Sequence, residues 1–122
     1  MRFGFYLSNS GPLAQTDAVV AIARLGDRLG FDCLVAGDHV IEPRGISSLY
    51  PYTVGGEVSW GAKGDGQWPE VITHLAFLAG VTERIRLVTS VMIVPYRSPI
   101  LTAKMLATVD VFSRGRLTVG VG

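Results

Sequence analysis

Hydrophobic residues change their spacing several times along this chain, and each change predicts a new element. Short apolar runs at residues 3–8 and 33–36 are typical of strands, whereas apolar residues recur at helical spacing between Asp17 and Leu29. Mostly apolar runs at residues 85–94 and 116–121 predict two further strands. Because these runs lack a clear alternation, we expect strands that are buried on both faces, as in parallel sheets.

Capping residues set the limits of the first helix. Thr16 is a good N-cap, and Asp17 places a negative charge in the first turn, where the helix dipole favours it. Gly30 follows the last apolar position and is expected to end the helix, because glycine accepts the left-handed backbone that helix ends require.

Prolines indicate where two more helices begin. Pro69 is expected at the first helical position of a helix that opens after Trp68. The pair Ser98–Pro99 predicts a cap followed by a first-turn proline. That third helix extends to about residue 113, and Gly115 ends it.

Strands and helices therefore alternate, with a long loop at residues 37–67 between the second strand and the second helix. This order predicts an α/β fold of parallel strands joined by right-handed crossovers. Two architectures fit it, an open doubly wound sheet or part of a (β/α)₈ TIM barrel. A full barrel needs roughly 250 residues, so four strands and three helices amount to about half of one.

Composition narrows the class of protein. The 122 residues suit a single domain, and 48% hydrophobic with 17% charged residues excludes disorder. The net charge of +1, without a basic cluster, argues against a nucleic-acid partner. We expect no membrane span and no secretory signal, because the chain lacks the long apolar segments that these need. Cys33 is the single cysteine and cannot form an internal disulfide, so we expect a cytoplasmic protein.

His39 is the strongest catalytic candidate. It follows the second strand, and chemistry in parallel α/β barrels collects where strands end. Imidazole exchanges protons near neutral pH, and the adjacent Asp38 could orient a substrate or another side chain. The alternative is a surface Asp–His pair that caps a turn.

His74 is expected to be a partly buried helix residue. The two histidines and the cysteine are scattered along the sequence and do not show the spacing of metal ligands.

The triplet Thr89–Ser90–Val91 places two hydroxyl groups inside an apolar strand, where buried polar groups need partners. Ordinary β-propensity explains it equally well. Aromatic residues in and beside the long loop could wall a substrate pocket or anchor the loop. These aromatic residues are Tyr50, Tyr52, Trp60 and Trp68.

A set of motifs, in order, resembles the N-terminal half of the luciferase-like monooxygenase superfamily, in its deazaflavin (coenzyme F420)-dependent branch. The segments that carry the resemblance are LGFD at 29–32, GDHV at 37–40, YPY at 50–52, TSV at 89–91, VPYRSP at 94–99, LATVD at 106–110 and GRLTVGVG at 115–122. The resemblance implies a TIM barrel with a flavin or deazaflavin across the carboxyl ends of its strands. It departs in strand number, since the family's barrels have eight strands and this sequence supplies four.

The resemblance also implies roles for individual residues. Thr89, Ser90 and Val91 would contact the cofactor, with a non-prolyl cis peptide bond at Ser90–Val91. His39, with Asp38 beside it, would handle a proton next to the hydride-transfer centre. Gly120 and Gly122 would end the fourth strand beneath the cofactor.

The function expected from the resemblance is an oxidoreductase that transfers a hydride between coenzyme F420 and a small molecule. An FMN-dependent monooxygenase on the same fold is the alternative. Because a four-stranded sheet has two open edges, a non-catalytic half-barrel that self-associates is a further possibility, and we expect a homo-oligomer. A flavodoxin-like open sheet with a ligand at its switch point is a weaker one.

Overall fold

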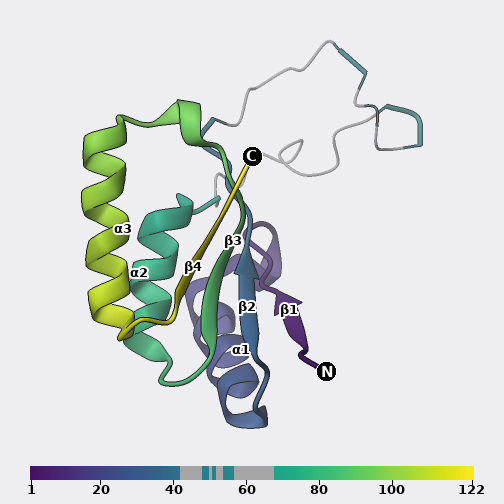
Figure 1. Cartoon of the computed structure of the whole chain (residues 1–122). Helices are drawn as coiled ribbons and strands as arrows, with labels where there is room; N and C mark the ends of the chain where they lie inside the picture. Colours follow the sequence, from purple (N-terminus) through teal and green to yellow (C-terminus); the bar gives the residue numbers. More distant parts are fainter. Residues whose placement is uncertain (42–47, 50, 52–53, 57–67) are drawn as a thin grey trace.

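A computed structural model describes residues 1–41, 48–49, 51, 54–56 and 68–122. Its four strands form one parallel sheet in the order β1-β2-β3-β4 (Figure 1). The strands are β1 (Gly4–Tyr6), β2 (Cys33–Ala36), β3 (Arg86–Met92) and β4 (Leu117–Val121). The predicted alternation and strand direction are confirmed. The sequential order is that of a barrel segment and excludes the 2-1-3-4 order of a doubly wound sheet.

Three helices connect the strands and pack beside one another on the sheet (Figure 1). They are α1 (Thr16–Leu29), α2 (Val71–Val81) and α3 (Pro99–Ser113), with short 3₁₀ turns η1 (Pro12–Ala14) and η2 (Val94–Tyr96). Right-handed crossovers between successive strands place all three helices on one face. The core lies between this helical layer and the sheet, and includes Leu34, Leu75, Leu78 and Leu87.

The prediction that the strands are buried on both faces was wrong. In β3, Leu87, Thr89 and Met92 are buried, whereas Arg86, Ser90 and Val91 are exposed. In β4, Thr118, Val119 and Val121 are exposed. One reason is that the helices cover one face of the sheet, so side chains on the other face remain accessible. A second is that β4 is an edge strand, where the neighbours Thr118 and Val119 are exposed although they point to opposite faces.

The two ends of α1 differ in how well the sequence predicted them. Gln15, not Thr16, is the N-cap, because Gln15 takes the extended backbone and Thr16 is already helical. Asp17 does lie in the first turn, as predicted. Gly30 is the C-cap with a left-handed φ of 81°, which confirms its predicted role.

For α2 and α3, too, some predicted helix ends agree with the structure and others do not. Pro69 is not helical, since α2 begins at Val71 and Glu70 is its N-cap. Ser98 and Pro99 do open α3, although Ser98 makes no side-chain capping bond. The left-handed turn at the end of α3 begins one residue before Gly115, at Arg114, whose φ is 57°.

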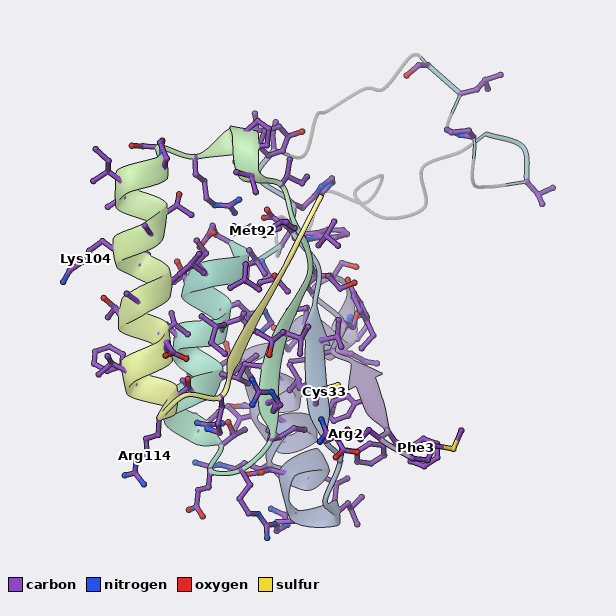
Figure 2. The ribbon with its side chains drawn as sticks, in the orientation of Figure 1. Arg2, Phe3, Cys33, Met92, Lys104 and Arg114 are labelled. Carbon is purple, nitrogen blue, oxygen red and sulfur yellow. The ribbon has the colours of Figure 1, made fainter. Side chains whose placement is uncertain are left out.

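No helix among the described residues is long and apolar enough to span a membrane. Cys33, at the start of β2, is a free thiol and partly buried. In Figure 2, Cys33 and Met92 mark the two ends of the sheet, and Lys104 and Arg114 project outward from α3.

Candidate cofactor site at the carboxyl ends of the strands

Parallel strands in sequential order bring their carboxyl ends to one edge, called the rim here. The residues that end or directly follow the strands at the rim are 7–9, 37–39, 92–93 and 120–122. The predicted gathering of the strand ends is therefore confirmed. The amino-terminal ends of α1, α2 and α3 lie at the same end, because each helix follows a strand (Figure 1).

His39 lies at the rim and contacts an aromatic residue from the start of the next helical segment. Its ring and that of Trp68 have centroids 4.5 Å apart and an interplanar angle of 49°. Both residues are partly buried. The other aromatic candidates, Tyr50, Tyr52 and Trp60, lie outside the described residues. Trp68 is thus the aromatic candidate that the structure places beside His39.

Asp38 holds a fixed position because its carboxylate is fully buried and bonded. Both oxygens accept from Arg97, at 2.6 Å from Nη1 and 2.7 Å from Nη2, and Oδ2 also accepts from the Ile93 N–H at 2.9 Å. Burial alone would raise the pKa of Asp38, but the bonds from Arg97 and Ile93 outweigh it and lower the pKa. The structure thus ties the end of β2 to the segment that follows β3.

Arg97 also binds Glu70, which extends the connection to α2. Its Nη2 and Nε lie 2.6 Å and 3.1 Å from Glu70 Oε1. The Asp38 carboxylate is the main reason that the pKa of Arg97 is raised. Burial would raise the pKa of Glu70, yet hydrogen bonds from Thr73, Ile72 and Arg97 lower it overall. Sequence reasoning missed Arg97 and Glu70. The one available signal was an acidic residue directly before a helix.

The triplet Thr89–Ser90–Val91 divides between two environments. Thr89 is 1% exposed, and its hydroxyl pairs with the backbone of Gly120. Ser90 and Val91 are exposed, the peptide bond between them is cis, and the β3–β4 register shifts between Thr89 and Met92. The predicted cis bond is confirmed. Ser90 and Val91 are accessible to a ligand, whereas the buried hydroxyl of Thr89 supports the strand pair.

Two glycines lie opposite this irregular stretch. A Cβ on Gly120 would lie 2.5 Å from the Thr89 carbonyl oxygen, and one on Gly122 would lie 2.7 Å from Val91 Cγ2. The close approach of the β3 backbone therefore requires glycine at position 120, whereas a side chain at position 122 would require Val91 to move. Gly120 and Gly122 add no side chains beside Val91, whereas Val121 between them carries an exposed one.

Asn9 is a third residue of this region that sequence reasoning missed, because it was interpreted only as part of the turn after the first strand. It is 2% exposed. Its Nδ2 donates to the Gly37 carbonyl at 3.1 Å, and its Oδ1 accepts from the Tyr6 hydroxyl at 3.0 Å. Asn9 therefore ties the end of β1 to the end of β2.

His74 lies in the first turn of α2 and not on a strand end. It is 5% exposed in α2, and neither ring nitrogen has a hydrogen-bond partner among the described residues. Burial lowers its pKa, which favours the neutral imidazole. No group of three potential metal ligands occurs within the described part of the chain.

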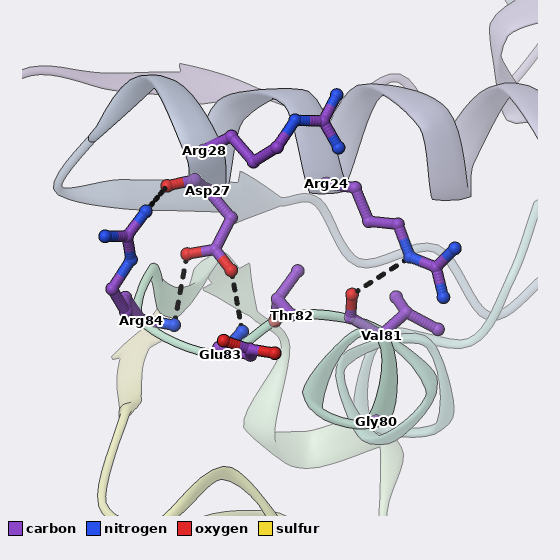
Figure 3. Close-up of a pocket in the computed structure, with 8 residues that line it drawn as sticks. All are labelled: Arg24, Asp27, Arg28, Gly80, Val81, Thr82, Glu83 and Arg84. Carbon is purple, nitrogen blue, oxygen red and sulfur yellow. Dashed lines mark hydrogen bonds between the residues drawn. The ribbon is translucent and has the colours of Figure 1, made fainter.

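A cavity of about 380 Å³ lies at the opposite end of the fold, between the ends of α1 and α2 (Figure 3). There Asp27 accepts hydrogen bonds from the N–H groups of Glu83, Arg84 and Ile85, at 2.7, 3.0 and 2.8 Å. Arg84 in turn donates to the Asp27 carbonyl, and Arg24 donates to the Val81 carbonyl. These hydrogen bonds connect α1 to the turn between α2 and β3, which gives Asp27, Arg84 and Arg24 a structural role.

The profile of the family described as luciferase-like monooxygenase matches residues 1–122. The chain belongs to this family. An uncharacterized protein of Mycobacterium tuberculosis is 34% identical over 102 residues, covering 84% of this chain and 36% of the relative. The 4-hydroxyprotoasukamycin monooxygenase of Streptomyces nodosus is 30% identical, covering 100% of this chain and 29% of the enzyme. The chain thus spans about a third of the length of these relatives.

Solved structures share the fold. The coenzyme F420-dependent tetrahydromethanopterin reductase from Methanopyrus kandleri has a TM-score of 0.67 at 20% identity, covering 99% of this chain and 26% of that one. The oxygenating constituent of 3,6-diketocamphane monooxygenase from Pseudomonas putida, solved with FMN, has a TM-score of 0.70 at 17% identity, covering 100% and 29%. The luciferase-like fold therefore occurs with either cofactor.

Proposed function

We propose that the protein carrying this sequence is an oxidoreductase that transfers a hydride between coenzyme F420 and a small-molecule substrate. The observation that carries the proposal is the position of His39 at a rim that also presents the exposed Ser90 and Val91. Membership of the luciferase-like family supports an oxidoreductase.

The residues present fit a flat cofactor ring. Ser90 offers a hydroxyl, Val91 offers an apolar surface that is 45% exposed, and Gly122 beside Val91 adds no side chain. A planar ring with an apolar face and polar edges suits such a surface. Ser90 and Val91 would hold the ring, which when bound supplies the hydride chemistry.

His39 is the group proposed to hold or move a proton. Imidazole can donate or accept near neutral pH, and the contact with Trp68 restrains the plane of its ring. Asp38 is proposed to act through position rather than by proton transfer, because Arg97 and Ile93 engage its carboxylate. Thr89 supports the cofactor surface from beneath through its bonds to Gly120.

The choice of coenzyme F420 over FMN rests on the Asp38–His39 pair at the end of β2, which resembles the deazaflavin branch. FMN remains the alternative, and structures of the same fold occur with each. Titrating the purified protein with each cofactor separately, followed by fluorescence and absorbance, distinguishes them. Saturable binding of coenzyme F420 with weaker binding of FMN supports the proposal, and the reverse order replaces it with the FMN alternative. Binding of neither overturns both.

Self-association is a second candidate, and it also bears on the proposed homo-oligomer. In the described part of the chain, β1 and β4 each pair on one side only, and Val119 and Val121 are exposed on β4. If two copies paired edge to edge, the backbone N–H and C=O groups left unpaired on β1 and β4 would gain hydrogen-bond partners. Size-exclusion chromatography with light scattering tests this: a tight dimer supports ring closure, and a monomer at high concentration contradicts it. The proposed location remains cytoplasmic, on the basis of the free Cys33.

A further inference from the structure

The guanidinium of Arg97 bridges two carboxylates that come from distant parts of the chain. Asp38 follows β2, and Glu70 precedes α2, so the bridge joins the beginning and the end of the long connection between them. The Arg97 side chain is 9% exposed and that of Asp38 is 0% exposed. Charge-assisted, bidentate bonds of this kind fix geometry more strongly than single neutral ones.

Each carboxylate is close in sequence to one ring of the aromatic pair. Asp38 directly precedes His39, and Glu70 follows Trp68 with Pro69 between them. The proline restricts the backbone between Trp68 and Glu70. Fixing Asp38 and Glu70 on one guanidinium therefore also sets the separation of His39 and Trp68, whose ring centroids lie 4.5 Å apart.

We infer that Arg97 is a positioning residue that sets the His39–Trp68 ring contact at the rim. It acts through Asp38 and Glu70, and it does not touch the reacting atoms. The importance of this role for catalysis rests on the proposed function, but the role itself is a property of the protein without cofactor. A test on the cofactor-free protein therefore separates the two claims.

The charges around Arg97 are consistent with its role as a positioning residue. One guanidinium faces two carboxylates, and the remaining negative charge is met by backbone N–H groups, from Ile93 for Asp38 and from Ile72 and Thr73 for Glu70. All three guanidinium nitrogens donate within this group of residues. A lysine could supply the charge but not the planar fork that binds both carboxylates at once.

The test is nuclear magnetic resonance of the cofactor-free protein, with the cross-peak between the His39 and Trp68 ring protons as the readout. In Arg97→Lys and Arg97→Met we expect the cross-peak to fall to less than half of its wild-type intensity. Arg28→Met, which removes an exposed arginine of α1 far from the rim, is the matched control and is expected to leave it unchanged.

The outcomes are separable from loss of fold. Amide spectra show whether each variant is folded, and if Arg97→Met is not, Arg97→Lys decides. A folded Arg97→Lys variant with an unchanged cross-peak overturns the inference, whatever the cofactor titrations show. A weakened cross-peak supports it even if neither cofactor binds, in which case only the proposed function fails.

Discussion

The hydroxyl of Thr89 bonds twice to Gly120, donating to its carbonyl at 2.8 Å and accepting from its N–H at 2.9 Å. These side-chain bonds bridge β3 and β4 where their register shifts. A hydroxyl group can make both bonds because it is a donor and an acceptor at once.

Thr89→Val should therefore destabilise the fold, because it keeps the shape of the side chain but leaves both backbone groups of Gly120 without their partner. A buried unsatisfied group costs about 1–3 kcal/mol. Urea unfolding measures the change in the free energy of unfolding. Thr89→Ser, which keeps the hydroxyl, should lose less, and an equal loss in the two variants would contradict this role.

Alanine substitutions at two glycines should change the stability of the fold in opposite directions. Gly120→Ala should destabilise the fold by about 1–3 kcal/mol, because its Cβ would lie 2.5 Å from the Thr89 carbonyl oxygen and the strands would have to separate. Gly80→Ala, inside α2 with nothing within 4 Å of the new Cβ, should stabilise it by about 0.5–1 kcal/mol. Thermal unfolding of both variants checks the pair. A stable Gly120→Ala variant would show that the strands adjust freely.

Asp27→Asn should cost about 2–3 kcal/mol at neutral pH, since hydrogen bonds to a charged group contribute most and an amide offers one acceptor oxygen in place of two. Burial would raise the pKa of Asp27, but the N–H groups of residues 83–85 outweigh it and lower the pKa. The ionised carboxylate therefore stabilises the fold above its unfolded pKa of about 3.9, and this stability is lost as pH falls through the lower folded pKa.

Urea midpoints measured between pH 7 and pH 3 test this dependence. The difference between wild type and Asp27→Asn should shrink toward the acid end. A difference that stays constant over this range would show that the charge of Asp27 is not what the backbone donors require.

Sequence spacing was sufficient for features that depend on nearby residues. It predicted the left-handed Gly30, the Ser98–Pro99 helix start and the placement of His39 after β2, because local backbone preferences decide all three. The sequential strand order also followed, from alternating elements and crossover handedness together with the family resemblance.

The Asp38–Arg97–Glu70 group could not be predicted in this way. Arg97 is 59 residues from Asp38 and 27 residues from Glu70 along the chain, and the pairing depends on how the strand ends are packed. The open face of β3 was missed for a related reason. An apolar run such as residues 85–94 indicates strand, but it does not say whether a second layer covers the other face.

His74→Leu should leave stability at pH 7.5 unchanged or raise it by about 1–2 kcal/mol, because the buried imidazole has no partner among the described residues. Burial lowers the pKa of His74 in the folded state. The wild type should thus lose stability as pH falls below the unfolded value of about 6.5, and the leucine variant should not share that loss. Unfolding at pH 7.5 and pH 5 measures both, and an advantage of the variant that does not grow at pH 5 would contradict the burial argument.

His39→Ala tests the proposed proton-handling role in the protein that carries this sequence, with its cofactor bound. General acid–base groups contribute on the order of a hundredfold or more to turnover, so kcat should fall by at least that much. The dissociation constant of the cofactor should change far less, because Ser90 and Val91, not His39, are proposed to hold the ring. Steady-state kinetics and fluorescence titration measure the two quantities separately. His74→Leu is the matched histidine control and should leave both nearly unchanged, since the His74 side chain is buried in α2 and lies outside the proposed site. If His39→Ala weakens cofactor binding as much as it lowers kcat, His39 is a binding residue, and if kcat does not change, His39 takes no part in the reaction.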